Sequence, residues 1–462
     1  MAEPLPDQGP NDLREDDYAL DPGLVSAVVE AVDAGERGAV LDLIDGLHVA
    51  DIADLTEQIG SNPRRSFVEL VWGELDQSVL VELETGVRDE VLGLLEPAQV
   101  AEAAKDLDTD DVVYLIEALD EDVQRSVLEA LDPPERVAVS KSLSYPDYSA
   151  GRLMETDFVK APPFWTVGQM IDWLRAEDEL PDSFYDIIIV DPAAKPIGML
   201  GLGVLLANRR PVTLGSIMWT DHKPLHVEDP QENVAYAFKQ YHLVSAPVVD
   251  DDGRVVGVIT IDDAVEALDE EAEEDLKRLG GVGDEEISDR VWAITKRRFP
   301  WLAVNLVTAI LASLVIGLFE GVIAELVALA ILMPIVASMG GNAGTQTLTV
   351  AVRGLATRDL TPTNALRVVS REALVGLANG LAFAILMGAI AWLWFGSPVL
   401  GAVIAAAMVV NLVVAGLAGI LIPLWLERAG ADPALASGAF VTTVTDVVGF
   451  FAFLGLAALV LL

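Results

Sequence analysis

Residues 333–346 read MPIVASMGGNAGTQ, a run of small and polar residues set inside a much longer apolar stretch. Pro334 removes one helix hydrogen-bond donor, and three glycines within the run loosen the backbone. Ser338, Asn342 and Thr345 recur at three- and four-residue steps, so on a helix they share one face. Polar groups are costly in hydrocarbon, so this face meets either a close neighbouring helix or an aqueous path. The run alone leaves both alternatives open.

The run belongs to the second of five apolar segments that follow residue 298. A helix needs about 20 residues to cross a hydrocarbon core of about 30 Å, and each segment is long enough. The segments are 300–319, 323–350, 373–395, 399–426 and 433–462. The sequence therefore predicts a transmembrane domain with five spans over residues 299–462.

Basic residues predict the orientation of these spans. Residues 296–298 read KRR ahead of the first segment, and four of the five later arginines lie between Arg353 and Arg371. Connections on the cytoplasmic side carry the excess of Lys and Arg. Five crossings of the inner (cell) membrane then place the C-terminus outside.

Acidic residues are distributed very unevenly along the chain. Of the 72 Asp and Glu residues only seven follow residue 298, whereas 24 of the 29 Lys and Arg residues precede residue 299. So anionic a soluble part repels nucleic acid and attracts cations over roughly 8 Å at physiological salt. Residues 1–22 are polar and acidic, which does not resemble a cleavable signal, so we expect the soluble part in the cytoplasm.

One carboxylate lies deep inside the fifth segment. Asp446 follows Gly438 and Thr442 at four-residue steps and lies near the predicted bilayer midplane. An ionised carboxylate there costs on the order of 3 kcal/mol, so it requires a partner or water. No Lys or Arg lies inside the five segments. Two interpretations remain, a protonated Asp hydrogen-bonded between helices or a cation ligand on an aqueous path, and we favour the second.

The first part of the soluble body reads as short amphipathic helices. Residues 87–97 reappear 36 positions later as residues 123–133, with the same apolar spacing and the same closing Leu-acid-Pro triplet. A period of this size indicates stacked helical hairpins. We expect an all-α superhelical N domain over residues 22–145, preceded by a disordered acidic segment over residues 1–21.

Past residue 145 the pattern changes to mixed α/β. Two related units, 146–216 and 217–276, each open on a hydrophobe-Met pair and then run strand, helix, strand, strand, helix. This order resembles a tandem pair of CBS domains, modules that often bind adenine nucleotides. Thr260 and Asp263 match the ribose- and phosphate-contacting Thr-x-x-Asp of that family, whereas residues 201–204 of the first unit carry neither group. The resemblance implies at most one nucleotide site, for ATP, in each chain.

A run of carboxylates ends this region. Residues 269–275 read DEEAEED on a predicted helix, and like charges three and four residues apart destabilise a helix unless a cation bridges them. A solubilising linker is the alternative. The connecting segment 277–298 follows, and its apolar residues between Asp284 and Arg298 recur at helical spacing. This spacing predicts an amphipathic helix near the membrane surface.

In their order along the chain, these features resemble the MgtE family of magnesium channels and transporters. The shared features are Pro334, the GGNAGTQ run at 340–346, the VTTVTD run at 441–446, the CBS pair, the helical N domain and the five spans. The resemblance implies a homodimer whose pore lies on the two-fold axis, lined by the second and fifth spans. The pore residues implied to hold a largely hydrated Mg²⁺ are Asp446, Thr442 through its carbonyl, Asn342, Gly340 and Gly341.

The same resemblance implies control by internal Mg²⁺. Mg²⁺ would bridge acidic faces of the N domain, the CBS pair and the connecting, or plug, helix 284–298, and so close the pore. Matched by position, the sensor residues are Glu232, Asp263, Glu266, Glu271, Glu274 and Asp275. Repulsion among these carboxylates favours an open state, and bound cations favour a closed one. A nucleotide at Thr260 and Asp263 would shift the same equilibrium.

The expected architecture is a multidomain membrane protein with a cytoplasmic all-α superhelical N domain, tandem α/β CBS domains and a five-helix transmembrane domain. The expected function is a Mg²⁺-selective channel or transporter gated by intracellular Mg²⁺. Two alternatives are a broader conduit for Mn²⁺, Co²⁺ or Ni²⁺ and a membrane-anchored CBS nucleotide sensor. The first lacks soft ligands, because the chain has no cysteine and its four histidines precede residue 299. No P-loop, HExxH motif or recognisable pair of nucleophile and base indicates an enzyme.

Overall fold

The structure of the chain, a computed structural model, describes residues 20–177, 180–181, 184–282, 285, 291–435 and 438–461. The chain divides into two compact units, Met1–Asp269 and Glu270–Leu462, each with hydrophobic cores of its own. Residues 1–19 of the segment expected to be disordered lie outside the described residues. The last two residues of that segment already belong to the fold, since Leu20 is buried and Asp21 caps the first helix.

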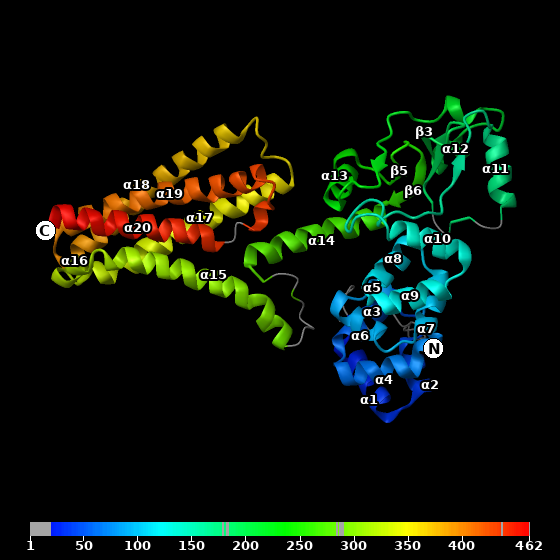
Figure 1. Cartoon of the computed structure of the whole chain (residues 1–462), viewed down its shortest axis with the longest axis horizontal. Coiled ribbons are helices and arrows are strands. Elements are labelled where there is room, and N and C mark those ends of the chain that lie inside the picture. Colours follow the sequence, from blue (N-terminus) through cyan, green and yellow to red (C-terminus); the bar gives the residue numbers. More distant parts are fainter. Residues whose placement is uncertain are drawn as a thin grey trace, which may run out of the picture. The chain divides into compact units, whose positions relative to one another are not determined.

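The N domain is a stack of short helices (Figure 1). They are α1 (Pro22–Ala34), α2 (Arg37–Ile44), α3 (Val49–Gln58), α4 (Ser61–Val71), η2 (Trp72–Glu74), α5 (Val79–Glu82), α6 (Thr85–Leu92), α7 (Pro97–Ala103), η3 (Ala104–Asp106), α8 (Thr109–Glu117), α9 (Glu121–Ala130) and α10 (Pro133–Ser142). One hydrophobic core runs from Leu20 to Val139, as expected for hairpins that bury their apolar faces against their neighbours.

The 36-residue repeat corresponds to the helix pairs α6–α7 and α9–α10. Val91 of α6 and Val127 of α9 occupy matching positions and are both buried. Pro97 and Pro133 each begin the second helix of the pair, where a missing backbone N–H costs nothing. The periodicity therefore predicted the all-α domain correctly.

The CBS pair has the expected element order, twice. The first half contains β1 (Lys160–Ala161), α11 (Val167–Ala176), β2 (Asp186–Val190), β3 (Pro196–Gly201) and α12 (Leu202–Ala207). After η4 (Leu214–Ser216), the second contains β4 (Leu225–His226), α13 (Gln231–Tyr241), β5 (Ser245–Val249), β6 (Val255–Thr260) and α14 (Ile261–Gly280). In each three-stranded sheet the first strand pairs in parallel with the second, and the second pairs antiparallel with the third.

The opening segments of the two halves are exchanged. Met154, which opens the first half, packs in the core of the second, where a Cβ added to Gly257 would lie 2.7 Å from its sulfur. Met218, which opens the second half, packs in the core of the first, and a Cβ on Gly198 would lie 2.7 Å from its sulfur. The two halves therefore form one folded body.

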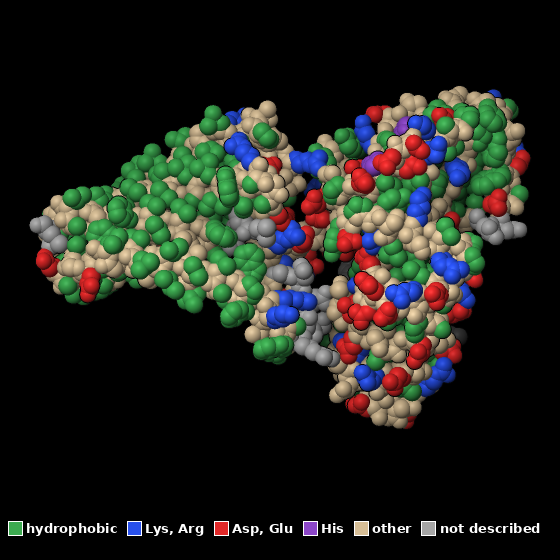
Figure 2. Space-filling model, viewed as in Figure 1, with side chains coloured by type: hydrophobic (Ala, Val, Ile, Leu, Met, Phe, Trp, Pro, Cys, Tyr) green, Lys and Arg blue, Asp and Glu red, His purple; other side chains and the backbone are tan. Residues whose placement is uncertain are grey.

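Within its described residues, the second unit contains five helices long and apolar enough to cross a membrane: α15 (Val291–Gly317), α17 (Ala328–Ala356), α18 (Ala365–Phe395), α19 (Pro398–Arg428) and α20 (Gly438–Leu461). The short helices α16 (Glu320–Glu325) and η5 (Pro433–Leu435) lie between them. Hydrophobic side chains cover the visible face of this unit, and charged side chains gather at its ends (Figure 2). The five predicted spans are thus present as helices.

Two boundaries differ from expectation. Helix α15 passes through Pro300 without interruption, so no helix end separates the described part of the connecting helix, from Val291, from the first span. Proline costs one backbone hydrogen bond there, which a long helix tolerates. The remainder of the expected connecting helix, apart from Glu285, lies outside the described residues. The second long helix begins at Ala328 rather than at residue 323, because α16 forms a separate turn before it.

Helix α19 lies at the centre of the membrane unit. It packs against α17, α18 and α20, and it buries more of its surface than the other four long helices. Glycines allow these close approaches: a Cβ on Gly419 would lie 2.6 Å from the carbonyl oxygen of Gly344. Helix α19 therefore holds α17 and α20, which carry the two motifs of interest.

Candidate functional site

The two polar motifs of the membrane unit meet along the contact between α17 and α20. A Cβ on Gly341 would lie 3.2 Å from Cγ2 of Thr442, and one on Gly344 would lie 2.5 Å from Cγ1 of Val441. Gly340 and Gly341 are both buried. The structure therefore brings together Gly340, Gly341 and Thr442, which are about 100 residues apart in sequence.

The polar face of α17 is exposed within a single chain. Asn342, Thr345 and Thr349 are exposed although they lie in the middle and last part of a membrane-spanning helix. The Asn342 amide lies 3.4 Å from the Ser338 hydroxyl, and the Thr345 hydroxyl donates to the Gly341 carbonyl at 3.0 Å. Polar groups at this depth face a bundle interior or water rather than lipid. Either water or a second chain must therefore lie against this face.

Asp446 lies one helical turn after Thr442 on α20 and is half-buried. Among the described residues, no Lys or Arg forms an ion pair with its carboxylate. The Thr442 carbonyl accepts a hydrogen bond from the Thr445 hydroxyl at 2.9 Å, in addition to its place in the helix. Asp446 is therefore a carboxylate within a membrane-spanning helix that has no basic partner among the described residues, and the Thr442 carbonyl already accepts a side-chain hydrogen bond.

The first unit contains a group of carboxylates, which we call the acidic cluster: Asp108, Asp110, Asp111, Glu155, Asp262, Asp263 and Glu266. Helix α8 supplies Asp110 and Asp111 in its first turn, and α14 supplies Asp263 in its own first turn. Glu155 lies in the exchanged opening segment, where its backbone pairs with Val258. The N domain and the CBS pair thus contribute acids to one region.

Burial and mutual repulsion disfavour the charged forms in this cluster. Burial, with repulsion from Asp263, raises the pKa of Asp110 well above its usual range. Burial, reinforced by neighbouring acids, raises the pKa of Asp111 to about 7, that of Glu155 to about 8 and that of Asp263 to about 6. One oxygen of Asp110 is buried without a hydrogen-bond partner among the described residues. A bound cation or proton would relieve this repulsion.

Thr260 and Asp263, expected at a nucleotide site, also cap helix α14. The Asp263 carboxylate accepts hydrogen bonds from the Thr260 backbone amide at 3.2 Å and from its hydroxyl at 3.0 Å. The Thr260 hydroxyl also lies within hydrogen-bonding distance of Asp262 and Glu155. This is half of a capping box, in which the third helical residue satisfies the N-cap amide. The hydroxyl is thus occupied by carboxylates rather than free for a ribose.

The other predicted sensor residues are placed differently. Glu232 is exposed in the first turn of α13, and Glu271, Glu274 and Asp275 lie further along α14 than Asp263. Glu274 forms an ion pair with Arg278 one turn later, which offsets part of the repulsion expected along the run. Within the part of the chain that the structure describes, no three acidic or histidine side chains form a ready-made metal cage.

Known proteins resemble this chain along most of its length. Family profiles match the MgtE intracellular N domain at residues 47–148, a CBS domain at 214–270 and the MgtE divalent cation transporter at 333–456. "Magnesium transporter MgtE" of Thermus thermophilus is 30% identical over 459 residues, covering 95% of this chain and 98% of its own length. The chain belongs to the MgtE family.

A second relative and a solved structure were also compared with the chain. "Magnesium transporter MgtE" of Bacillus subtilis is 28% identical over 435 residues, covering 94% of this chain and 96% of its own. A solved structure of the cytosolic domain of the Mg²⁺ channel MgtE in complex with ATP is 25% identical. It covers 52% of this chain and 99% of its own, with a TM-score of 0.48. As an MgtE protein, the chain is a multi-pass membrane Mg²⁺ transporter with a cytosolic domain.

The sequence analysis did not recognise three residues that stand out in the structure of this MgtE protein. Asp110 and Glu155 were not singled out, although Asp110 lies in an acidic run at a helix start and Glu155 directly follows the hydrophobe-Met pair. Asn411, a polar residue in the middle of the apolar fourth span, was also missed. A lone amide between long apolar runs was the available signal.

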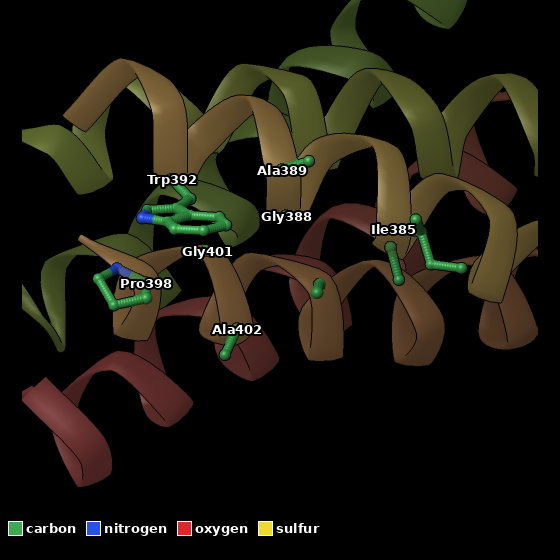
Figure 3. Close-up of a pocket in the computed structure, with 9 residues that line it drawn as sticks. Ile385, Gly388, Ala389, Trp392, Pro398, Gly401 and Ala402 are labelled. Atoms are coloured by element: carbon green, nitrogen blue, oxygen red, sulfur yellow. The ribbon is translucent and has the colours of Figure 1, made fainter. Parts of the chain in front are cut away.

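A shallow cavity of about 310 Å³ lies between α18 and α19 (Figure 3). Its lining is apolar or glycine and includes Ile385, Trp392, Pro398 and Ala402. It contains no carboxylate or amide side chain that could hold Mg²⁺, so we do not connect it with transport in this MgtE protein.

Proposed function

We propose that the chain is a Mg²⁺-selective channel of the inner membrane that works as a homodimer, with the pore on the two-fold axis. The exposed polar face of α17, with Asn342 at its centre, carries this proposal. In a single chain this face has only lipid or water to meet, and a second copy would enclose it with Asp446 of both chains. The N-terminal domains lie in the cytoplasm, and the C-terminus lies outside.

The chemistry of Mg²⁺ suits such sparse ligands. Mg²⁺ prefers octahedral oxygen coordination and sheds water reluctantly, so it keeps several waters when proteins bind it. Two Asp446 carboxylates would balance its charge, and the Asn342 amides would contact its bound water. Because the Thr442 carbonyl is already engaged, we propose that Thr442 acts through water as well.

We further propose that internal Mg²⁺ closes the pore by binding at the acidic cluster and along α14. The buried, unpartnered oxygen of Asp110 and the raised pKa values of Asp111 and Glu155 support this proposal. Without a cation, carboxylates of the N domain and the CBS pair repel one another, which favours separation of these faces. With Mg²⁺ bound through one or two carboxylates and water, the compact state is favoured.

ATP binding near Thr260 and Asp263 would be coupled to Mg²⁺ binding. A nucleotide would have to displace the carboxylates that now contact the Thr260 hydroxyl. Because Mg²⁺ would draw these carboxylates away, we expect ATP to bind more tightly with Mg²⁺ present. Equilibrium dialysis of the full chain with and without Mg²⁺ measures this, and equal ATP binding in both would remove the coupling.

The pore assignment is tested by Mg²⁺ uptake into vesicles that contain the purified protein. Asp446→Asn and Asp446→Ala remove the charge, and we expect both to abolish uptake while the dimer still assembles. Glu427→Gln, which removes an exposed acid from the last turn of α19, is the matched control and should transport normally. Uptake at the parental rate in Asp446→Ala would remove Asp446 from the path. Competition by Mn²⁺ and Co²⁺ in the same vesicles tests the broader-conduit alternative.

The gating proposal needs a separate measurement. Asp110→Asn combined with Asp263→Asn should leave maximal uptake intact but raise the internal Mg²⁺ needed for inhibition by about tenfold, since two charged ligands are lost. Glu129→Gln, an exposed acid of α9, is the control. Unchanged inhibition in the double variant would place the sensor elsewhere.

A further inference from the structure

Asn411 occupies an unusual position near the middle of α19. Its side chain is fully buried, with 0% exposure. Between Val399 and Leu426 the sequence contains no other charged, amide, hydroxyl or imidazole side chain. A buried polar residue inside a membrane span is costly and generally has a functional reason.

The Asn411 amide contacts both helices that carry the proposed pore residues. Its Nδ2 donates to the carbonyl oxygen of Val336 on α17 at 2.7 Å. A Cβ on Gly340 of α17 would collide with the amide, and one on Gly449 of α20 would lie 2.8 Å from Nδ2. The amide therefore fits into a space that two glycines leave open, one on each helix.

The oxygen of the Asn411 amide receives no hydrogen bond within this packing. Asn411 Oδ1 is buried and has no hydrogen-bond partner among the described residues. A leucine has a similar volume and would fill the space without leaving an unpaired acceptor. Packing alone therefore does not explain an amide here, and its donor bond to Val336 is the feature that leucine lacks.

The position of these contacts relates them to the ion path. Gly340 precedes Asn342 by two residues, and Gly449 follows Asp446 by three. We propose that Asn411 is a positioning residue that sets the register of α17 against α20, so that Asn342 and Asp446 lie at the spacing that hydrated Mg²⁺ requires. This inference rests on the proposed pore. Mg²⁺ tolerates little distortion of its coordination geometry. A loosened register between α17 and α20 should therefore reduce the uptake of Mg²⁺ more than that of the larger Ca²⁺.

The test uses the full chain in vesicles and measures the ratio of Mg²⁺ to Ca²⁺ uptake. Asn411→Leu should lower this ratio about three- to twentyfold, the range expected for one interhelical hydrogen bond. Val410→Leu, on the exposed face of the same helix, is the matched control and should keep the ratio. Thermal unfolding in detergent serves as the readout of fold. An unchanged ratio and unchanged half-saturating Mg²⁺ in Asn411→Leu would overturn the proposal.

A second comparison covers the case in which Asn411→Leu fails to fold. Gly449→Ala places a methyl group against the amide and should lower the uptake ratio in the parent. In an Asn411→Ala background the methyl group has room, so the same substitution should have little further effect. Equal effects in the two backgrounds would refute a role for the amide. Asp446→Asn in the same assay separates the two ideas: normal transport there would contradict the pore itself, not only Asn411.

Discussion

The guanidinium of Arg278 pairs with the carboxylate of Asp432, although 154 residues separate them in the chain. Arg278 lies near the end of α14 and also pairs with Glu274 on the preceding turn. Asp432 lies just before η5, in the connection that leads into α20 and its Thr442 and Asp446. The ion pair therefore links α14 to the connection that precedes a proposed pore helix.

Breaking this link should weaken the transmission of the inhibitory signal. In Arg278→Gln we expect normal maximal Mg²⁺ uptake and an inhibitory internal Mg²⁺ concentration about two- to fivefold higher, as fits a partly exposed pair. Lys277→Gln is the matched control, because Lys277 pairs with Glu273 on its own helix, at 2.9 Å. Vesicle uptake at a series of internal Mg²⁺ concentrations measures both. If the two variants behave alike, the pair with Asp432 has no part in gating.

The acidic cluster predicts a stability that falls as pH rises. Burial raises the pKa of Asp263 to about 6, that of Asp111 to about 7 and that of Glu155 to about 8, whereas unfolded carboxyls titrate near 4. The folded state therefore holds these protons to higher pH than the unfolded state does. The resulting stabilisation is fully present below about pH 4 and is lost as pH rises through 6 to 8.

Thermal unfolding of the full chain in EDTA should show this as a lower Tm at pH 8.5 than at pH 5.5. Mg²⁺ should raise Tm strongly at pH 8.5 and little at pH 5.5, because protons already neutralise the cluster in acid. Asp111→Asn should flatten the dependence and stabilise the protein without Mg²⁺ at pH 8.5 by on the order of 1 kcal/mol. A Tm in EDTA that rises across this range would contradict the assigned pKa shifts.

Local patterns predicted the elements of this fold well, and contacts between distant residues explain what was missed. The 36-residue repeat and the order of strands and helices in the CBS pair can each be recognised from residues close together in sequence, and the structure contains both. The exchange of Met154 and Met218 between the CBS halves depends on tertiary packing, which no local pattern encodes. Asp263 was expected as a sensor, but its neighbour Asp110 belongs to another domain and was found only in the structure.

The membrane part shows the same division. Asp446 and Asn342 were recognised because polar groups stand out in an apolar span. The packing around these two residues was not predictable from local sequence. It depends on contacts between helices, such as the one between Gly341 of α17 and Thr442 of α20. The connecting helix 284–298 and the span from residue 300 were expected as separate segments, yet α15 (Val291–Gly317) continues through Pro300, because a long helix tolerates one proline.

Gly257 should be essential for joining the two CBS halves. A Cβ there would lie 2.6 Å from the backbone carbonyl of Glu155, which cannot move without disturbing the exchanged segment. We expect Gly257→Ala to destabilise the cytosolic part by about 1–3 kcal/mol, the usual cost of overpacking. Gly203→Ala is the control, because nothing lies within 4 Å of that position in helix α12, and it should be neutral or slightly stabilising.

Chemical denaturation followed by tryptophan fluorescence measures both variants. The prediction fails if Gly257→Ala is as stable as Gly203→Ala, since the opening segment would then be free to shift. Gly198→Ala should also lower the free energy of unfolding, but by less. There the added Cβ would meet the flexible Met218 side chain at 2.7 Å and the Trp219 carbonyl at 2.9 Å.

Gly419 should be equally critical in the membrane, because it brings α19 against the glycine-rich part of α17. A Cβ there would lie 2.6 Å from the Gly344 carbonyl oxygen and 2.8 Å from Cβ of Thr347, so the two helices would have to separate. Gly419→Ala should then lower the unfolding temperature in detergent and reduce Mg²⁺ uptake, since Gly344 also adjoins α20. Gly317→Ala, at the end of α15 with nothing within 4 Å, is the matched control and should change neither property. Normal uptake and stability in Gly419→Ala would mean that the α17–α19 contact is looser than the packing of these glycines requires.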